Sequence, residues 1–421
     1  MPKIQITSKG IRAALKKYTP YQSLVEYIWN GFDAQASIIK IDYIANELGN
    51  IETITISDNG YGIPHSKLQD KFEPLFESKK ALENKLKKNL SAIHGKNGIG
   101  RLTFFTFARN ASWKTVYSES ETNSTYEIYA NAENINLYTG VNATPHCTLE
   151  QTGTVVTFSG VHTLTSFQLE EKLQEYILKE FAWFLALNRH RSFAIIINGI
   201  PIDFKHIIAD SEKIELAHPE TKTVFFLYYV RWDQRLNNEP SRYYYVNSEH
   251  KECWKEPTAI KNKGEQFYHS FFIESAYFDA FSFQSAEVQK QEALIVGTRS
   301  DAQFKFLRKK LANILRIKRR PFLKGFAQQL LSEYSQKNIL PESPHKNLDQ
   351  AIKTLYEMQP KIFTSLNLEQ KKMLTGLLNI ILKSDQNKTA FQLFNKIIEL
   401  NEEEQRELDR LFTTKNDTNI S

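Results

Sequence analysis

The sequence is poor in cysteine and contains no long apolar run. Only two of its 421 residues are cysteines, Cys147 and Cys253. Two cysteines are too few for a disulfide framework and lack the paired spacing of a structural zinc site, so we expect both to be reduced. No apolar stretch approaches the roughly 18 residues that a membrane-spanning helix requires. The first residues, Met1 to Gln5, also lack the apolar core of a secretory signal. These absences predict a cytoplasmic protein without membrane contact.

The composition is that of a folded, multidomain chain. Hydrophobic residues make up 41% of the sequence and charged residues 24%, too apolar a balance for a disordered chain. At roughly 100 to 200 residues per domain, two or three domains are expected. Lys and Arg exceed Asp and Glu by six. This mild excess suits a polyanionic partner but does not require one.

The first 160 residues show the pattern of an α/β sandwich. Thr19 followed by Pro20 predicts a helix that runs to about Ala36. Two alternating runs after it predict a β-hairpin. The segment 58–100 is long for a simple connection and is typical of a lid. The remaining predicted elements are a helix over 101–109 and strands over 113–117, 125–129 and 154–158.

The rest of the chain divides into an aromatic-rich region and a helical region. A helix over 167–187 and a hairpin turning at Asn198-Gly199 precede strand-like runs rich in tyrosine and phenylalanine. From about Ala302 the pattern is helical. We therefore predict an α+β protein with domains 1–160, 161–300 and 301–421.

Three short motifs in the first domain carry chemistry. Glu26, Asn30 and Asp33 share one face of the first predicted long helix, which taken alone is most often a solvated face. Asp58 follows a strand and begins a turn containing three candidate ligand-contacting residues: Gly60, Gly62 and Ile63. A glycine-rich loop then leads into the predicted helix at Arg101, where backbone N–H groups can meet phosphate oxygens. Its residues are Gly95, Lys96, Asn97, Gly98, Ile99 and Gly100.

The glycine-rich loop matches neither common nucleotide-binding pattern. It lacks the Gly-Lys-Ser or Gly-Lys-Thr of a Walker A loop, and no strand directly precedes it as a Rossmann fingerprint requires. In their order and spacing, however, the three motifs resemble those of the gyrase, Hsp90, histidine kinase and MutL (GHKL) ATPase superfamily. Gly153-Thr154, at the start of a later strand, fits a fourth family element. The resemblance covers residues 1 to about 160 and implies a Bergerat-type α/β sandwich that binds ATP.

The resemblance also implies a role for each motif. Asp58 would accept a hydrogen bond from the adenine amino group, with Thr154 beside the base and Gly62 permitting close backbone approach. Asn30 would ligate Mg²⁺ through its amide oxygen. Glu26 would act as general base toward the attacking water. Asp33 belongs to the same face, and the lid and its glycine loop would add Lys79 and Lys96 at the phosphates.

Parts of the superfamily fit less well. The first histidine is His65, which leaves no phosphoacceptor histidine ahead of the nucleotide domain, and the Gly-Lys-Asn-Gly loop differs from that of MutL. Hsp90-like and MORC-like ATPases match better. In Hsp90, MutL and gyrase relatives a lysine or arginine of a second, transducer domain reaches the γ-phosphate. The middle region is expected to be such a transducer domain. Arg299 is our candidate for the residue that reaches the γ-phosphate, although it is equally well interpreted as an ordinary surface arginine.

The third predicted domain begins with a basic helix. Nine basic and no acidic residues lie between Ala302 and Ser332, from Lys305 to Lys324. They could bind nucleic acid phosphates, or they could be solvated or paired with acids such as Glu407, while Phe304, Leu307 and Leu311 face inward.

Two functions remain open from the sequence. In the first, ATP closes a homodimer through the N-terminal domains and hydrolysis reopens it, giving a switch or clamp on a macromolecule such as DNA. In the second, the nucleotide is regulatory and the C-terminal helices form an adaptor for a protein partner. A role in bacterial antiviral defence is a further hypothesis from analogy alone.

Overall fold

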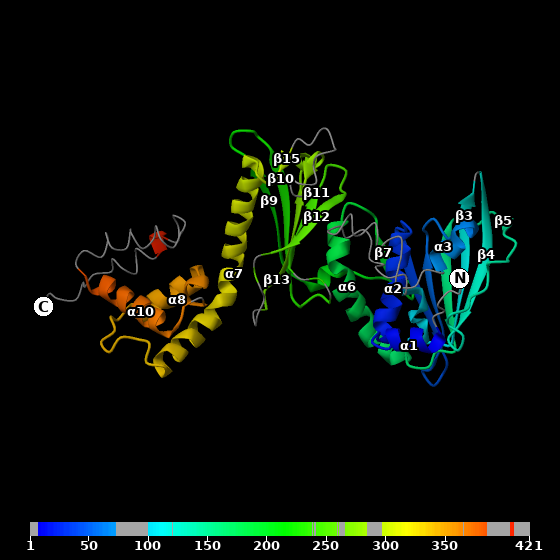
Figure 1. The fold of residues 1–421 in the computed structure, drawn as a ribbon, viewed down its shortest axis with the longest axis horizontal. Helices are drawn as coiled ribbons and strands as arrows, with labels where there is room; N and C mark the ends of the chain where they lie inside the picture. The colour runs from blue at the N-terminus through cyan, green and yellow to red at the C-terminus, as the bar shows by residue number, and fades with distance from the viewer. Residues whose placement is uncertain are drawn as a thin grey trace, which may run out of the picture. The chain divides into compact units, whose positions relative to one another are not determined.

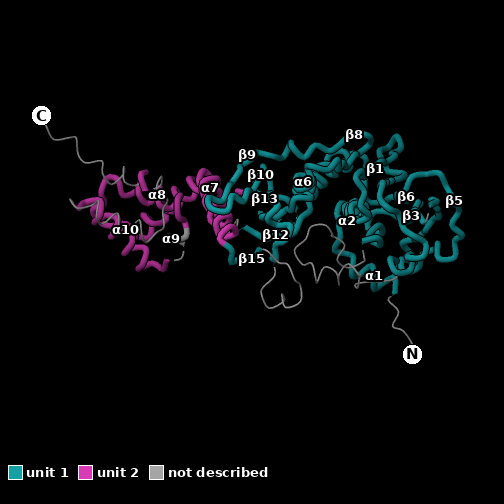
Figure 2. Tube along the Cα trace, turned by 90° about the horizontal axis from the view of Figure 1, so that it is seen from above, with its two compact units in different colours: residues 1–261, 268–301 teal, residues 262–267, 302–421 magenta. Residues whose placement is uncertain are grey.

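The computed structural model describes most of the chain and divides it into two compact units. The described residues are 7–72, 100–119, 121–237, 239, 241–258, 260, 266–283, 297–364, 366–384 and 405–407. The first unit comprises residues 1–261 and 268–301, and the second comprises 262–267 and 302–421 (Figure 2). The domain boundaries that we drew from the sequence at 160 and 300 remain a prediction.

The first unit contains an eight-stranded sheet in the order β5-β4-β3-β6-β2-β1-β7-β8 (Figure 1). The predicted hairpin is present as antiparallel β1 and β2. The hairpin that turns at Asn198-Gly199 adds β7 parallel to β1, so this sheet extends past residue 160. The strands are β1 Ile38–Ala45, β2 Ile51–Asp58, β3 Asn110–Glu119, β4 Thr122–Asn131, β5 His146–Thr148, β6 Gly153–Ser159, β7 Ala194–Ile197 and β8 Ile200–Pro201.

Helix α2 begins where the sequence predicts a cap. Thr19 and Gln22 form a capping box at the start of α2 (Pro20–Asp33), which satisfies backbone N–H groups that the helix leaves free. The predicted helix over 101–109 is instead a 3-10 turn, η2 (Gly100–Thr106). The other helical segments are α1 Ser8–Leu15, η1 His65–Lys67, α3 Leu68–Phe72, α5 Ser166–Gln168, the π-helical η3 Leu169–Leu173 and α6 Gln174–Leu187.

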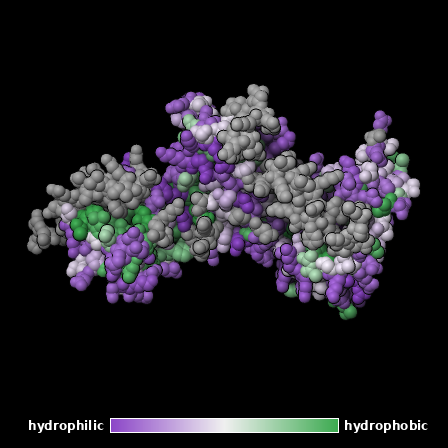
Figure 3. Space-filling view, in the orientation of Figure 1, coloured by the Kyte–Doolittle hydropathy of each residue, from purple (hydrophilic) through white to green (hydrophobic). Residues whose placement is uncertain are grey.

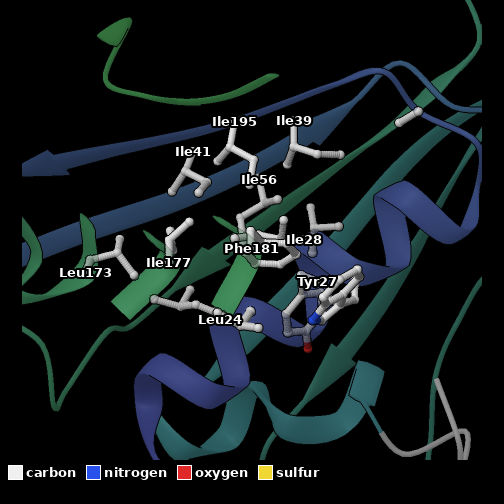
Figure 4. Packing of buried hydrophobic residues seen from close by; sticks show 14 of the residues in the cluster. Leu24, Tyr27, Ile28, Ile39, Ile41, Ile56, Leu173, Ile177, Phe181 and Ile195 are labelled. Carbon is white, nitrogen blue, oxygen red and sulfur yellow. The ribbon is translucent and has the colours of Figure 1, made fainter. Parts of the chain in front are cut away.

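Two helices, α2 and α6, build the core against the sheet. Ile28 of α2 and Phe181 of α6 are fully buried, and both lie among isoleucines of β1, β2 and β7 (Figure 4). The rings of Trp29 and Phe181 are 4.4 Å apart between centroids. Burying each such side chain contributes about 2 kcal/mol. Because this apolar face is fixed in the core, the opposite, polar face of α2 is fixed in orientation too.

A second sheet in the same unit has the order β12-β11-β13-β10-β9. Its core is aromatic, and it reaches α6 through Trp183, whose ring stacks on that of Tyr244 with centroids 5.6 Å apart. The strands are β9 Ile208–Ala217, β10 Val224–Trp232, β11 Arg242–Val246, β12 Glu252–Pro257 and β13 Tyr268–Glu274. Two 3-10 turns and a small parallel pair complete the described part: η4 Phe204–Ile207, η5 Ala276–Phe278, β14 Phe281–Ser282 and β15 Gly297–Thr298.

The second unit is helical. Its core gathers around buried Leu323, Leu331, Ile352 and Leu378, and Asn367 and Gln370 form a capping box at the start of its last described long helix. Its helices are α7 Ala302–Gln336, α8 Leu348–Met358, α9 Lys361–Thr364 and α10 Leu368–Lys383. No helix among the described residues has the length and apolarity to cross a membrane. The fold class is therefore α+β, with a large-sheet N-terminal region, a further sheet and a helical C-terminal region, as predicted.

Candidate functional site

The polar face of α2 carries the first group of predicted residues. Asn30 is exposed, whereas Glu26 and Asp33 are partly buried. The buried Tyr27 beside them donates a hydrogen bond from its hydroxyl to the Arg101 carbonyl, at 2.7 Å. This bond fixes the start of η2 against α2.

Gly100 lies directly against the Glu26 carboxylate. A methyl group added at Gly100 would lie 2.6 Å from Glu26 Oε2, closer than real carbon contacts allow. Any other residue at position 100 would therefore displace this carboxylate. The absent side chain lets the Glu26 carboxylate lie close to the backbone at the start of η2.

Asp58 begins a row of three polar side chains across neighbouring strands. It pairs in register with Thr154 of β6, and Thr154 pairs with Thr115 of β3. Residues directly opposite on paired strands point to the same face of a sheet. The hydroxyls of Thr115 and Thr154 are 3.2 Å apart. A methyl group added at Gly31 would lie 3.1 Å from Asp58 Cβ, so this row faces α2.

The Asp58 carboxyl is held in a poorly solvated place. Burial raises the pKa of Asp58 from 3.8 to about 6, against the opposing effects of backbone N–H bonds from Gly60 and Thr154 and the charge of Lys71. Its Oδ1 accepts the Gly60 N–H at 2.8 Å. A strongly perturbed carboxyl that is fixed by such bonds is typical of a functional site.

The loop after Asp58 is fastened to the sheet through its glycines. Gly62 has a φ of +71°, and a methyl group there would lie 2.1 Å from the Val116 carbonyl oxygen. The Ile63 N–H donates to Thr115 Oγ1 at 2.8 Å, and the Tyr126 hydroxyl donates to the Ile63 carbonyl at 3.0 Å. The glycine permits an approach of two backbone segments that a side chain would prevent.

Tyr61 and Lys71 border the same carboxylates. The Lys71 ammonium lies 4.8 Å from the centroid of the Tyr61 ring. Burial, and after it the charges of Asp33 and Asp58, raise the pKa of Tyr61. The tyrosine hydroxyl therefore lies within the field of both acids, one from α2 and one from the end of β2.

Several predicted residues are not placed beside this group. Lys79, Gly95, Lys96, Asn97, Gly98 and Ile99 lie outside the described residues. Arg299 pairs with Glu256, with Nη2 and Oε2 3.2 Å apart, and its guanidinium lies over the rings of Trp254 and Phe283. Its role at a γ-phosphate remains a prediction.

Sequence reasoning missed Thr115, Tyr61 and Lys71. Thr115 looks like any inward position of an alternating strand, and only the register of β3 with β6 reveals its neighbours. Tyr61 stands inside the recognised Asp-Asn-Gly-Tyr-Gly sequence, which was a signal that could have been used. Lys71 belongs to a segment without periodicity and gave no signal.

Comparisons with known proteins agree with the motifs. Residues 18–154 match the family described as histidine kinase-, DNA gyrase B-, and HSP90-like ATPase. A search of curated proteins finds no match.

Similar solved structures include the N-terminal domain of a DNA repair protein, at 13% identity and a TM-score of 0.38, covering 73% of this chain and 98% of that one. Another is the ATPase and transducer domains of DNA topoisomerase II from Balamuthia mandrillaris, at 13% identity and a TM-score of 0.36, covering 61% of this chain and 72% of that one.

Proposed function

We propose that the protein binds ATP with Mg²⁺ and hydrolyses it to ADP and phosphate, because residues 18–154 match the family of histidine kinase-, DNA gyrase B-, and HSP90-like ATPases. One observation carries the proposal. Helix α2 places Gly31 against Asp58 and places the Glu26 carboxylate against Gly100. Helix α2 thus carries Glu26, the proposed general base, and packs against the end of β2, which carries Asp58, the proposed acceptor for the adenine amino group.

The row formed by Asp58, Thr154 and Thr115 is the part of the site proposed to bind adenine. Asp58 would accept the adenine amino hydrogen through an oxygen that its bonds to Gly60 and Thr154 orient. Thr154 and Thr115 present hydroxyls on the same face. The missing side chain of Gly62 makes room for the Val116 carbonyl, so this glycine would hold the loop after Asp58 in place beside the ligand.

The phosphate end lies along the polar face of α2. The Asn30 amide is exposed, and its oxygen is a ligand type that Mg²⁺ accepts, so the residues present fit the ion. When bound, Mg²⁺ would neutralise phosphate charge during transfer. Glu26 would orient the attacking water and take its proton. The loop 95–100 and Lys79 are proposed to contact the phosphates, with Arg299, which follows β15, as the candidate from the middle region.

The assignment of Glu26 is tested by separating binding from turnover. Glu26→Ala should keep its affinity for ATP within a few-fold and lose at least about 100-fold in the rate of phosphate release, the scale of a general base. Glu52→Ala, at an exposed position of β2, is the matched control and should behave like the wild type. Wild-type phosphate release from Glu26→Ala would reject Glu26 as the base.

We further propose that ATP binding drives homodimerisation through the N-terminal regions, which makes the protein a switch or clamp. Light scattering coupled to size exclusion should show a doubled mass for Glu26→Ala with ATP and Mg²⁺, and a monomer with ADP. An unchanged mass under both conditions would remove the switch from the proposal while leaving hydrolysis intact.

Nucleic acid is the proposed partner of α7. Phe304, Leu307 and Leu311 are buried as predicted, while Lys305, Lys309 and Lys310 are exposed. Further along, Arg320 pairs with Glu357 and Glu407, which neutralises part of the basic stretch.

The exposed lysines can be tested by salt dependence. Changing all three to glutamine should weaken DNA binding and reduce the slope of log K against log salt by about 3, since each phosphate contact contributes about 0.9. Equal changes at exposed lysines of the first unit, Lys205, Lys213 and Lys222, should leave the slope unaltered. A triple variant of α7 that retains the wild-type slope would exclude this surface.

The alternative, a nucleotide-regulated adaptor, is favoured by one feature of the second unit. Four apolar side chains of α10 are more than two-fifths exposed: Leu368, Met373, Leu377 and Ile380. Figure 3 shows apolar residues gathered on this unit. Negligible ATPase activity in the presence of DNA, RNA and candidate proteins would favour the adaptor. The antiviral hypothesis predicts that Asp58 and Glu26 variants change phage plating.

A further inference from the structure

Two histidines and a glutamate that are distant in sequence meet at one point of the first unit. His190 follows α6, His250 lies in the turn between β11 and β12, and Glu274 ends β13. His190 Nε2 is 3.3 Å from Glu274 Oε2, and His250 Nδ1 is 2.5 Å from Glu274 Oε1. The two imidazole rings stack with centroids 4.2 Å apart.

This cluster has the donor set of a transition-metal site. One ligand atom from each residue lies within 4.8 Å of the others, and it is the one such group within the described residues. Ligands of a tetrahedral zinc ion, with bonds of about 2.0 to 2.1 Å, lie about 3.3 Å from each other. Two imidazole nitrogens and a carboxylate oxygen suit zinc and its neighbours in the first transition row, whereas Mg²⁺ prefers oxygen alone.

Each ligand is presented by an ordered backbone. His250 adopts a φ of +57° in a turn whose Asn247 side chain accepts the N–H groups of Glu249 and Lys251. His190 follows Asn188, whose side chain bonds back to the Phe184 carbonyl at the end of α6. These turns limit the rearrangement that an ion would require, which lowers the entropic cost of binding.

Arg189 bounds the cluster on one side. Its Nη2 is 3.2 Å from Glu274 Oε2, and its guanidinium lies 5.0 Å from the centroid of the Tyr228 ring. A carboxylate offers about four lone-pair sites, so Glu274 can keep this bond and still ligate an ion. The arginine would orient the carboxylate, while its charge opposes the ion and limits the affinity. Burial and the Arg189 charge lower the pKa of His190, which favours the neutral, ligating imidazole.

We propose that His190, His250 and Glu274 form a binding site for one Zn²⁺-class ion, with water in the fourth position. The histidine side chains are 41% and 43% exposed, which leaves that position open to solvent. The bound ion would join the end of α6, which packs on the eight-stranded sheet, to the second sheet. It would contact the second sheet at the β11–β12 turn and at the end of β13.

Metal binding by the full chain tests the proposal without nucleotide. After dialysis against EDTA, Zn²⁺ uptake is measured by competition with a chromophoric chelator, and Co²⁺ is added separately as a spectroscopic probe. The wild type should take up one equivalent, give the absorption of tetrahedral Co²⁺ and unfold at a higher temperature with Zn²⁺, because the ion binds the native state. His190→Gln and His250→Gln should each weaken uptake at least about tenfold, the lower bound seen for losses around metal ligands. His206→Gln, at an exposed histidine outside the cluster, should not.

Three results would overturn the site. These are no uptake by the wild type, uptake that His190→Gln and His250→Gln leave unchanged, and an equal loss in His206→Gln. Thermal unfolding in EDTA checks that the variants fold, and Glu274→Gln supplies an independent third ligand change with the same expected loss. Since none of these measurements involves ATP, their failure leaves the proposed ATPase activity untouched.

Discussion

Burial of the ionised Asp58 carboxyl should lower the free energy of unfolding, because the carboxyl proposed to bind the nucleotide is poorly solvated in the folded protein. Its pKa rises from 3.8 to about 6 in the folded protein. Folding therefore favours the protonated carboxyl over the ionised one. The stability that the protonated form contributes is fully present below pH 3.8 and is lost as the pH rises through about 6. The shift corresponds to about 3 kcal/mol at neutral pH.

Asp58→Asn removes this cost without removing the local hydrogen bond. The asparagine oxygen can still accept the Gly60 N–H, while its amide group then faces the base as a donor. We expect the difference in free energy of unfolding, variant minus wild type, to increase by about 2.4 kcal/mol between pH 4 and pH 8, since a small part of the full shift is already lost at pH 4. The variant should also lose ATP binding, since the asparagine amide and the adenine amino group are both hydrogen-bond donors and would face each other.

Urea denaturation of both proteins across this pH range measures the difference, and calorimetry measures nucleotide binding. Asp42→Asn is the matched control, because Asp42 is an exposed carboxylate on β1 of the same sheet and should give a flat difference. If the Asp58→Asn difference also stays flat, or if the variant is the less stable protein at pH 8, the electrostatic reasoning is wrong.

Alanine substitutions at three glycines should affect activity and stability differently. Gly100→Ala meets the movable end of Glu26, so the rate of hydrolysis should fall at least about tenfold while stability changes by less than about 1 kcal/mol. Gly62→Ala meets the Val116 carbonyl at positive φ and should destabilise the protein by more than about 2 kcal/mol. In Gly325→Ala nothing lies within 4 Å of the added methyl, and this helix position should gain about 1 kcal/mol. Urea denaturation and steady-state phosphate release distinguish the three, and a Gly100→Ala enzyme with full activity would contradict the proposed role of Glu26.

The sequence predicted the elements that depend on local signals. Thr19, Pro20 and Gln22 determine the start of α2 through bonds within a few residues, and the alternation in β1 and β2 was equally direct. The segment after Gly100 was predicted as an α-helix but is a 3-10 turn. Thr103 and Thr106 each bond back to a carbonyl three residues earlier, a pattern that apolar periodicity does not reveal.

Contacts between distant segments could not be predicted. The hairpin at Asn198-Gly199 was recognised by its turn, yet its pairing with β1 joins residues about 150 positions apart. Thr115 acquires its neighbours from strand register, and His190, His250 and Glu274 converge only through the packing of α6 on the second sheet. The order of the motifs predicted the candidate site because it resembles the order in a known family. The contacts between distant segments, in contrast, follow no recognisable spacing in the sequence.

Calorimetric titration of the full chain with ATP and Mg²⁺, with Asp58→Asn measured in parallel, determines whether Asp58 holds an adenine nucleotide. The wild type should bind ATP at one site per chain, ADP should compete for this site, and the variant should give no heat of binding. Absence of adenine nucleotide uptake by the wild type, or equal uptake by Asp58→Asn, would contradict it.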